Sequence, residues 1–191
     1  MFGIDVSENN GQIDWNAVSS QCQFAIIRSS YGKSGIDSQF QTNASNAKSA
    51  GLIIGAYHYS YALDPDDAIL EGLSCKEQIE ESGLEFDLPI FFDMEDADGY
   101  KSRNGFDFSQ DNITNICKNF INALAPLNAG VYASYDWLIN KIAYQSLNCP
   151  IWCAAWGSQS PDDIQNLKIW QYSDNLIISG TVFDGDITID Q

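Results

Sequence analysis

The chain alternates short apolar segments with amphipathic ones from end to end. LIIGAY at 52–57 and LPIFF at 88–92 lack the every-second-residue polar position of a half-exposed strand. Such near-continuous apolar runs indicate strands that are buried on both faces, as in a parallel sheet covered by helices. Strands are predicted at Phe2–Val6, Phe24–Ser29, Ile53–Ser60, Pro89–Met94, Gly130–Ala133, Ile151–Ala155, Lys168–Tyr172 and Gly180–Phe183. Helices are predicted at Trp15–Ser20, Ser38–Ala50, Pro65–Ser82, Gln110–Ala125 and Asp136–Lys141.

Capping residues at the expected helix ends support these predictions. Asp14, Asp64 and Ser109 stand where an N-cap is expected, because their side chains can accept hydrogen bonds from the first free backbone N–H groups. Gly51 and Gly83 stand where helices should end.

About eight strands alternating with helices predict an α/β fold, a closed (β/α) TIM-like barrel. Few helices are evident after about residue 142, so the last strands are expected to be irregular and joined by loops. An open doubly wound sheet is the competing architecture, but no glycine-rich phosphate-binding turn follows the first strand. A length of 191 residues is enough for one domain, and we assign residues 1–191 to a single domain.

The charge balance excludes some partners. Nine Lys and Arg residues stand against 26 Asp and Glu, a formal net charge of −17. This disfavours nucleic acid, whose binding depends on neutralising phosphates, and it disfavours anionic membranes. No apolar run is long enough to cross a bilayer, and the first residues, MFGIDVS, lack the features of a secretory signal. We therefore expect synthesis in the cytoplasm and export by another route.

The thiols and the single histidine give little sign of chemistry. The five cysteines are odd in number and widely spaced, which favours reduced thiols over disulfides. A Cys/His zinc site is disfavoured because His58 is the only histidine. His58, within YHY, is equally compatible with the hydrophobic core and with a cleft.

Carboxylates follow several of the predicted strands. In a barrel of this class, active sites are built at the C-terminal ends of the strands, and the first and last strands are neighbours. The acidic residues at these ends are Asp5 on the first strand, Asp93, Glu95 and Asp96 on the fourth, and Asp184 and Asp186 on the last. We expect Asp186 and Asp190 to be solvated residues of the tail, and acids at strand ends can also simply cap helices.

Asp93 and Glu95 are two residues apart on a strand, so their side chains share one side while Met94 points away. Two carboxylates in one partly desolvated space cannot both ionise easily, so one pKa must rise. A carboxylic acid that stays protonated near neutral pH can protonate a glycosidic oxygen. We assign that role to Glu95, whose longer side chain reaches further into a cleft.

Aromatic residues also gather near the strand ends, where their rings can stack on the apolar faces of sugars. About half of them are expected to be ordinary core residues. Arg28, at the end of the second strand, is expected to pair with the acidic cluster and hold a carboxylate ionised. The candidate substrate-binding residues are Tyr59, Tyr61, Tyr132, Trp156, Trp170 and Arg28.

Seven segments, spread over nearly the whole chain, resemble the glycoside hydrolase family 25 (Chalaropsis-type) lysozymes, many of them from phages. The specific elements are the opening G-I-D-V-S, the central D-x-E and the late W-Q-Y. The segments are GIDVSENNGQIDW at 3–15, FAIIRSSYG at 24–32, GAYHYSY at 55–61, LPIFFDMED at 88–96, GVYAS at 130–134, IWCAAWG at 151–157 and IWQYSD at 169–174.

The resemblance implies a muramidase of endolysin type that cuts the β-1,4 bond from N-acetylmuramic acid to N-acetylglucosamine in bacterial peptidoglycan. It implies Glu95 as the general acid with Asp93 beside it and Asp5 in support. The family's V-D-x-N-like segment reads F-D-G-D here, so Asp184 is the best match and Asp186 stays open. No cofactor and no metal are implied. We expect a monomeric catalytic domain that acts on the cell wall, and the ending TIDQ suggests that a longer chain continues beyond it.

Two mechanisms and two other functions remain open at this stage. Asp93 can orient the substrate's own N-acetyl group for attack, which we favour, or a carboxylate can activate water. One alternative function is a metal-dependent hydrolase in which Asp93, Glu95, Asp96 and Asp184 hold a hard cation. The other is a sugar-binding barrel without catalysis.

Overall fold

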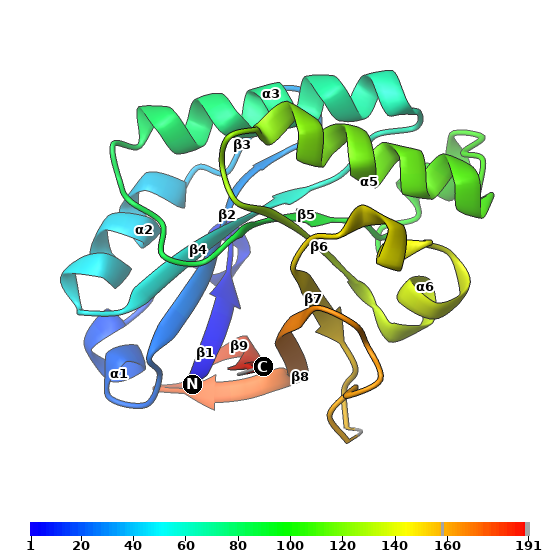
Figure 1. The fold of residues 1–191 in the computed structure, drawn as a ribbon. Helices are drawn as coiled ribbons and strands as arrows, with labels where there is room; N and C mark the ends of the chain where they lie inside the picture. Colours follow the sequence, from blue (N-terminus) through cyan, green and yellow to red (C-terminus); the bar gives the residue numbers. More distant parts are fainter. Residues whose placement is uncertain (158, 190–191) are drawn as a thin grey trace.

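The computed structural model describes residues 1–157 and 159–189. Within these residues, eight strands close into a barrel in the order β1, β2, β4, β5, β6, β7, β8, β9, with β1 paired to both β2 and β9 (Figure 1). The two-residue β3 adds to the outer part of β2. The barrel strands are β1 Phe2–Val6, β2 Phe24–Tyr31, β4 Ile53–Tyr59, β5 Ile90–Asp93, β6 Ala129–Ser134, β7 Ile151–Ala154, β8 Leu167–Ile178 and β9 Thr181–Thr188, and β3 is Gly35–Ile36. The predicted α/β barrel is confirmed.

The last strand runs against its neighbours. The strands β1 to β8 of the barrel pair in parallel, whereas β9 is antiparallel to both β8 and β1. Ser179 and Gly180 both have positive φ, 52° and 84°, which suits the tight turn that joins β8 to β9. The expectation that the acids of the last strand follow its C-terminal end at the rim was therefore wrong. Instead, β9 passes back along β1, and its register places Asp184 opposite Asp5.

The helices cover only part of the barrel. Helices α2, α3, α5 and α6 lie over the strands up to β7, while no helix of the described residues covers β8 and β9 (Figure 1). The loop between β7 and β8 is irregular, as the sequence indicated. None of the helices in the described part of the chain is long and apolar enough to cross a membrane. The helices are α1 Trp15–Ser19, α2 Phe40–Ser49, α3 Pro65–Glu81, α4 Tyr100–Arg103, α5 Gln110–Leu124 and α6 Tyr135–Asn140, with 3-10 turns η1 Glu8–Asn10 and η2 Tyr144–Leu147.

The predicted caps are present. The Asp14 carboxylate accepts from the N–H groups of Asn16 and Ala17, the Asp64 carboxylate from that of Asp67, and the Ser109 hydroxyl from that of Asn112. Each cap fixes where a helix begins and hence how the preceding strand or loop meets it. The short elements η1, β3, α4 and η2 carried no periodic signal and were not predicted.

Two apolar clusters hold the barrel together. The larger lies between the strands and the helices, and it includes His58's neighbours Phe92 and Phe120. The smaller fills the barrel interior with mainly aromatic side chains, among them Phe91 and Trp152. Gly130 on β6 makes room for it, since a Cβ there would lie 2.7 Å from the Phe91 ring. Side chains of this smaller cluster therefore fill the inside of the barrel.

Candidate active site

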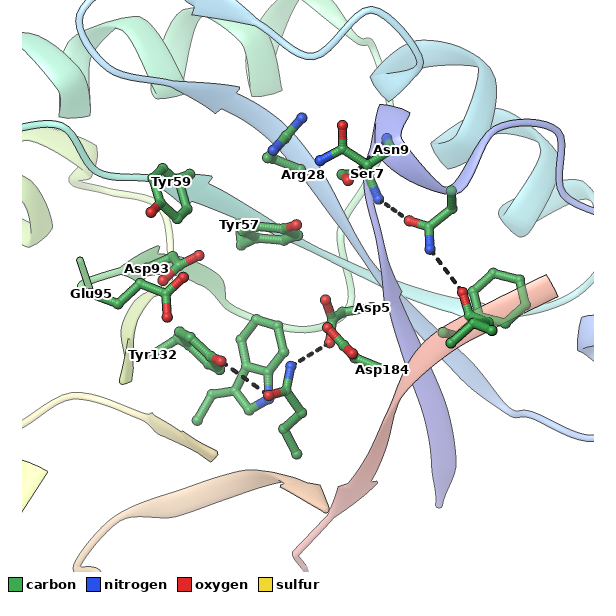
Figure 2. A pocket seen from close by; sticks show the side chains of 15 residues that line it. Asp5, Ser7, Asn9, Arg28, Tyr57, Tyr59, Asp93, Glu95, Tyr132 and Asp184 are labelled. Atoms are coloured by element: carbon green, nitrogen blue, oxygen red, sulfur yellow. Dashed lines mark hydrogen bonds between the residues drawn. The ribbon is translucent and has the colours of Figure 1, made fainter. Parts of the chain in front are cut away.

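A cavity of about 300 Å³ lies at the C-terminal ends of the parallel strands. Its walls come from all seven of those strands, from the η1 region and from the returning strand β9 (Figure 2). A site at this end is where βα-barrels place their chemistry. The lining residues are Asp5, Ser7, Asn9, Asn10, Arg28, Tyr57, Tyr59, Asp93, Glu95, Tyr132, Trp152, Gln171, Val182, Phe183 and Asp184.

Asp93 and Glu95 both line this cavity, and Met94 between them is fully buried away from it. Burial, and next the neighbouring Glu95, raise the pKa of Asp93 well above its ordinary value. Burial also raises the pKa of Glu95. One carboxyl oxygen of Asp93, Oδ1, is buried and accepts no hydrogen bond from any described residue. Both carboxyl groups therefore bind a proton more tightly than free acids do, and Asp93 is the more deeply buried of the two.

The carboxylates Asp5 and Asp184 face each other across β1 and β9 on the opposite side of the cavity (Figure 2). Burial, and next Asp184, raise the pKa of Asp5 to about 8. Burial and the nearby Asp174 raise the pKa of Asp184 to about 6. The site thus holds several carboxyl groups whose environments disfavour full ionisation.

Asp186 is not the solvated residue that we expected. Its side chain is fully buried, accepts a hydrogen bond from Trp152 Nε1 at 2.8 Å and bonds to the Asp5 carboxyl group. Burial, and next the neighbouring Asp5, raise its pKa well above the ordinary value. Asp184 lines the cavity itself, whereas Asp186 lies behind Asp5. Asp190 lies outside the described residues.

Gln171 joins three parts of the site. Its Nε2 donates to Asp5 Oδ2 at 2.8 Å, while its Oε1 accepts from the Tyr132 hydroxyl at 3.0 Å and from Trp156 Nε1 at 2.9 Å. The residue is 2% exposed and sits at the centre of the W-Q-Y element of β8. Trp170 of that element was predicted to bind substrate, whereas Gln171 was not. On β8, the side chain of Gln171 points into the barrel, and that of Trp170 points to the other face.

Five aromatic residues line the cavity, namely Tyr57, Tyr59, Tyr132, Trp152 and Phe183 (Figure 2). Tyr132 and Trp152 lie 4.5 Å apart between ring centroids, and Tyr57 meets Trp152 edge-on at 5.9 Å. Burial, and next the charge of Glu95, raise the pKa of Tyr59. Of the tyrosines predicted to bind substrate, Tyr59 and Tyr132 line the cavity. Tyr57 and Trp152 also line it but were not predicted as binding residues. The alternation of inward and outward side chains along a strand is the signal that could have identified them.

Three other predicted binding residues lie outside the lining of the cavity. Tyr61 packs against Tyr59 and its hydroxyl donates to Asp98 at 3.0 Å. Trp156 borders a neighbouring groove, is 52% exposed and reaches the cavity only through its bond to Gln171. Trp170 turns to the other face of β8, where its Nε1 donates to the Ala155 carbonyl at 3.0 Å.

Arg28 lines the cavity but pairs with different acids from those we expected. Its Nε donates to Asp37 at 2.8 Å and its terminal nitrogen to Glu8 at 3.0 Å. Glu8 opens η1, so the guanidinium holds this turn at the rim of the cavity. The expectation that Arg28 pairs with the strand-end carboxylates was wrong, because Glu8 on η1 and Asp37 directly after β3 bind its guanidinium instead.

His58 belongs to the core. It is fully buried between the strands and α3, with Nδ1 bonded to the Ser30 hydroxyl at 2.8 Å and Nε2 lying 3.4 Å from Glu71. The five cysteines are buried and unpaired. In the residues that the structure describes, no three His, Cys, Asp or Glu side chains are grouped as a metal site would require. Asp96, one of the candidate ligands, instead binds the start of α4.

Comparisons with known proteins agree with this geometry. The family model described as "Glycosyl hydrolases family 25" matches residues 4–181. The "Autolytic lysozyme" of Clostridium acetobutylicum is 28% identical over 188 residues, which is 98% of this chain and 55% of that protein. "Lysozyme M1" of Streptomyces globisporus is 44% identical over 59 residues, 30% of this chain and 20% of that protein. The chain thus spans about half the length of the autolytic lysozyme.

Solved structures show the same fold. The CTP1L endolysin aligns with a TM-score of 0.84 at 22% identity, over 99% of this chain and 66% of that one. A bacterial lysozyme from Streptomyces coelicolor aligns with a TM-score of 0.77 at 25% identity, over 98% of this chain and 91% of that one. The family match covers nearly all of the chain, and on that ground the chain belongs to glycosyl hydrolases family 25.

Proposed function

We propose that this chain is a lysozyme that hydrolyses the β-1,4 bond between N-acetylmuramic acid and N-acetylglucosamine in bacterial peptidoglycan. Glu95 is the general acid in this proposal, and Asp93, Asp5 and Asp184 assist it. The observation that carries the proposal is one cavity that Asp93 and Glu95, both with raised pKa values, line together with a group of aromatic rings. The names of the family and of the related lysozymes supply the substrate class.

Substrate binding would settle which member of the pair carries the proton. The free Oδ1 of Asp93 is suited to accept an N–H group, such as that of the sugar's N-acetyl substituent. A hydrogen bond to the ionised form favours ionisation, so Asp93 would become the anion and the proton would rest on Glu95. Glu95 can then protonate the departing sugar oxygen while the oriented N-acetyl oxygen attacks the anomeric carbon.

The opposite wall has a separate task. Asp5 and Asp184 face the pair across the cavity, and the neighbourhood of Asp186 and Gln171 fixes Asp5 in place. Negative charge there, which at neutral pH lies mainly on Asp184 with its pKa of about 6, would stabilise the positive charge that develops on the sugar ring in the transition state. The tyrosine and tryptophan rings would contact the apolar faces of the sugars, and Trp156 would extend this surface beyond the cavity.

Glu95→Gln tests the proposal, because the amide keeps the size of the side chain and loses the acidic proton. Release of reducing ends from purified cell walls should fall about 100- to 10,000-fold. Glu80→Gln, on the exposed face of α3, is the matched control and should retain wild-type activity. Mass analysis of the digest should show muramic acid at the new reducing ends.

Three outcomes would contradict parts of the proposal. Wild-type activity in Glu95→Gln would remove Glu95 from its role. Glucosamine at the reducing ends would contradict the assignment of the bond. Binding to walls without release of reducing ends by the wild type would support a sugar-binding barrel instead. We further propose that the unit works as a monomer on the bacterial wall.

A further inference from the structure

Lys101 is a buried cation directly behind the proposed acid. It is 1% exposed and lies on the short helix α4. Its ammonium donates to the main-chain carbonyl of Glu95 at 2.9 Å and to that of Ser60. No ion pair forms between Lys101 and a carboxylate in the part of the chain that the structure describes. A buried charge without an ion partner is costly, so its presence here needs a reason.

The contacts of Lys101 link the ends of two strands. Ser60 follows β4, and its N–H donates to the carbonyl of Asp93, the last residue of β5, at 3.1 Å. Lys101 then joins the Ser60 carbonyl to the Glu95 carbonyl. One ammonium group therefore joins the main chain of Glu95 to that of Ser60, which in turn bonds to the main chain of Asp93. A shift of this segment would move both carboxyl groups relative to a bound sugar.

Two aspartates accept hydrogen bonds from the first backbone N–H groups of α4. Asp96 Oδ1 accepts from the N–H of Lys101 at 2.7 Å, and its Oδ2 accepts from that of Ser102 at 3.0 Å. Asp98 accepts from the N–H of Tyr100 at 2.9 Å. These hydrogen bonds hold the segment 95–102 in a turn that brings the Lys101 ammonium to the main chain of Glu95.

We propose that Lys101 is a positioning residue for the reaction, which fixes the main chain of Glu95 and sets by its charge the pH range in which the Asp93–Glu95 pair carries one proton. This proposal rests on the proposed function. Two effects are separable: the hydrogen bonds need only a donor, whereas the effect on proton affinity needs the positive charge.

The charged and titratable groups around Lys101 come from several elements. Glu71 faces it from α3 and Cys117 from α5, while Asp93, Glu95 and Asp96 face it from β5 and the loop that follows. The carboxyl pair also faces Asp5, Asp184 and Asp98, and Arg28 acts on Asp93 from β2.

Burial and the neighbouring acids raise the pKa values of Asp93 and Glu95, and the positive charge of Lys101 acts in the opposite direction. It lowers the pKa of Asp93 and that of Glu95, although burial leaves both above their ordinary values. Without it, the pair would hold its protons more tightly. Both limbs of a bell-shaped pH profile would then move to higher pH, whichever limb each group governs.

The test compares Lys101→Met, Lys101→Gln and Lys101→Arg with the wild type on a soluble tetrasaccharide of alternating N-acetylglucosamine and N-acetylmuramic acid. Lys118→Met is the matched control, since it removes one charge from the exposed face of α5. We expect kcat at the optimum to fall about 10- to 100-fold in Lys101→Met, because small displacements of reacting groups have effects of this size. Both limbs should move to higher pH in Lys101→Met and Lys101→Gln, while Lys101→Arg and Lys118→Met keep the wild-type profile.

The outcomes separate this proposal from the proposed function. Activity of the wild type together with unshifted limbs in a folded neutral variant would overturn the role of Lys101 alone. A wild type without activity on the tetrasaccharide and on walls would overturn the proposed function. Circular dichroism and thermal unfolding establish which variants fold. If Lys101→Met does not fold, Lys101→Gln carries the test, and failure of both to fold would assign Lys101 to the scaffold and overturn the proposal.

Discussion

Replacement of Gln171 by leucine should loosen the site and the barrel together. The side chain is 2% exposed and makes three hydrogen bonds, to Asp5, Tyr132 and Trp156. Leucine has a similar size and cannot make any of them. The Asp5 and Tyr132 partners are buried and lose a neighbour that water cannot easily replace, whereas Trp156 is 52% exposed and can bond to solvent.

The magnitude follows from these contacts. Each hydrogen bond contributes about 1 kcal/mol to the free energy of unfolding. The loss of all three therefore predicts about 3 kcal/mol, since the penalty for unpaired buried groups is partly offset by the apolar leucine. For a domain of this size, 1 kcal/mol corresponds to roughly 2–4 °C in Tm. We expect Tm to fall by about 6–12 °C.

Thermal unfolding followed by circular dichroism at pH 7 measures this change. Gln21→Leu is the control, because Gln21 is exposed and precedes the strand β2 without facing the cavity. The Gln171→Leu variant should also bind the tetrasaccharide less tightly, because Asp5 and Tyr132 lose a shared support. A Tm within 2 °C of both the wild type and the control would refute the view that Gln171 organises this wall.

Two further predictions concern pH and metals. Burial and Asp174 raise the pKa of Asp184 from 3.8 to about 6, so the folded state binds this proton more tightly than the unfolded chain does, and the stability it contributes is lost as pH rises from about 4 to 6. Asp184→Asn should therefore exceed the wild type in Tm above pH 6 and approach it near pH 4, and a gap that does not depend on pH would contradict the assigned pKa. Activity on walls should survive millimolar EDTA, because no metal-binding group of three acids exists among the described residues. Loss of activity that added magnesium or calcium restores would instead support the metal-dependent alternative.

Features that depend on neighbours within a few residues could be predicted from the sequence. The cap residues Asp14, Asp64 and Ser109 act through N–H groups two or three positions away, so their role is visible in the sequence. The shared side of Asp93 and Glu95 follows from the two-residue period of a strand, and the cavity contains both.

Other features depended on contacts between distant parts of the chain. Asp5 and Gln171 are 166 positions apart, and no local pattern announces their hydrogen bond. Asp186 looked like a tail residue because β9 was expected to end at the rim, and its burial follows from the antiparallel return of that strand along β1. Arg28 was assigned to the wrong acids because neither η1, which carries Glu8, nor β3, which precedes Asp37, was predicted.

The amino-acid sequence by itself thus determined the barrel class, most helix boundaries and the two acids of the central strand. Each of these depends on periodicity or on hydrogen bonds within a few residues. Tertiary structure decided which acids are buried, which amide links them and which cation lies behind Glu95. Those properties depend on strand direction and on how closely distant elements pack, and short-range patterns do not encode either.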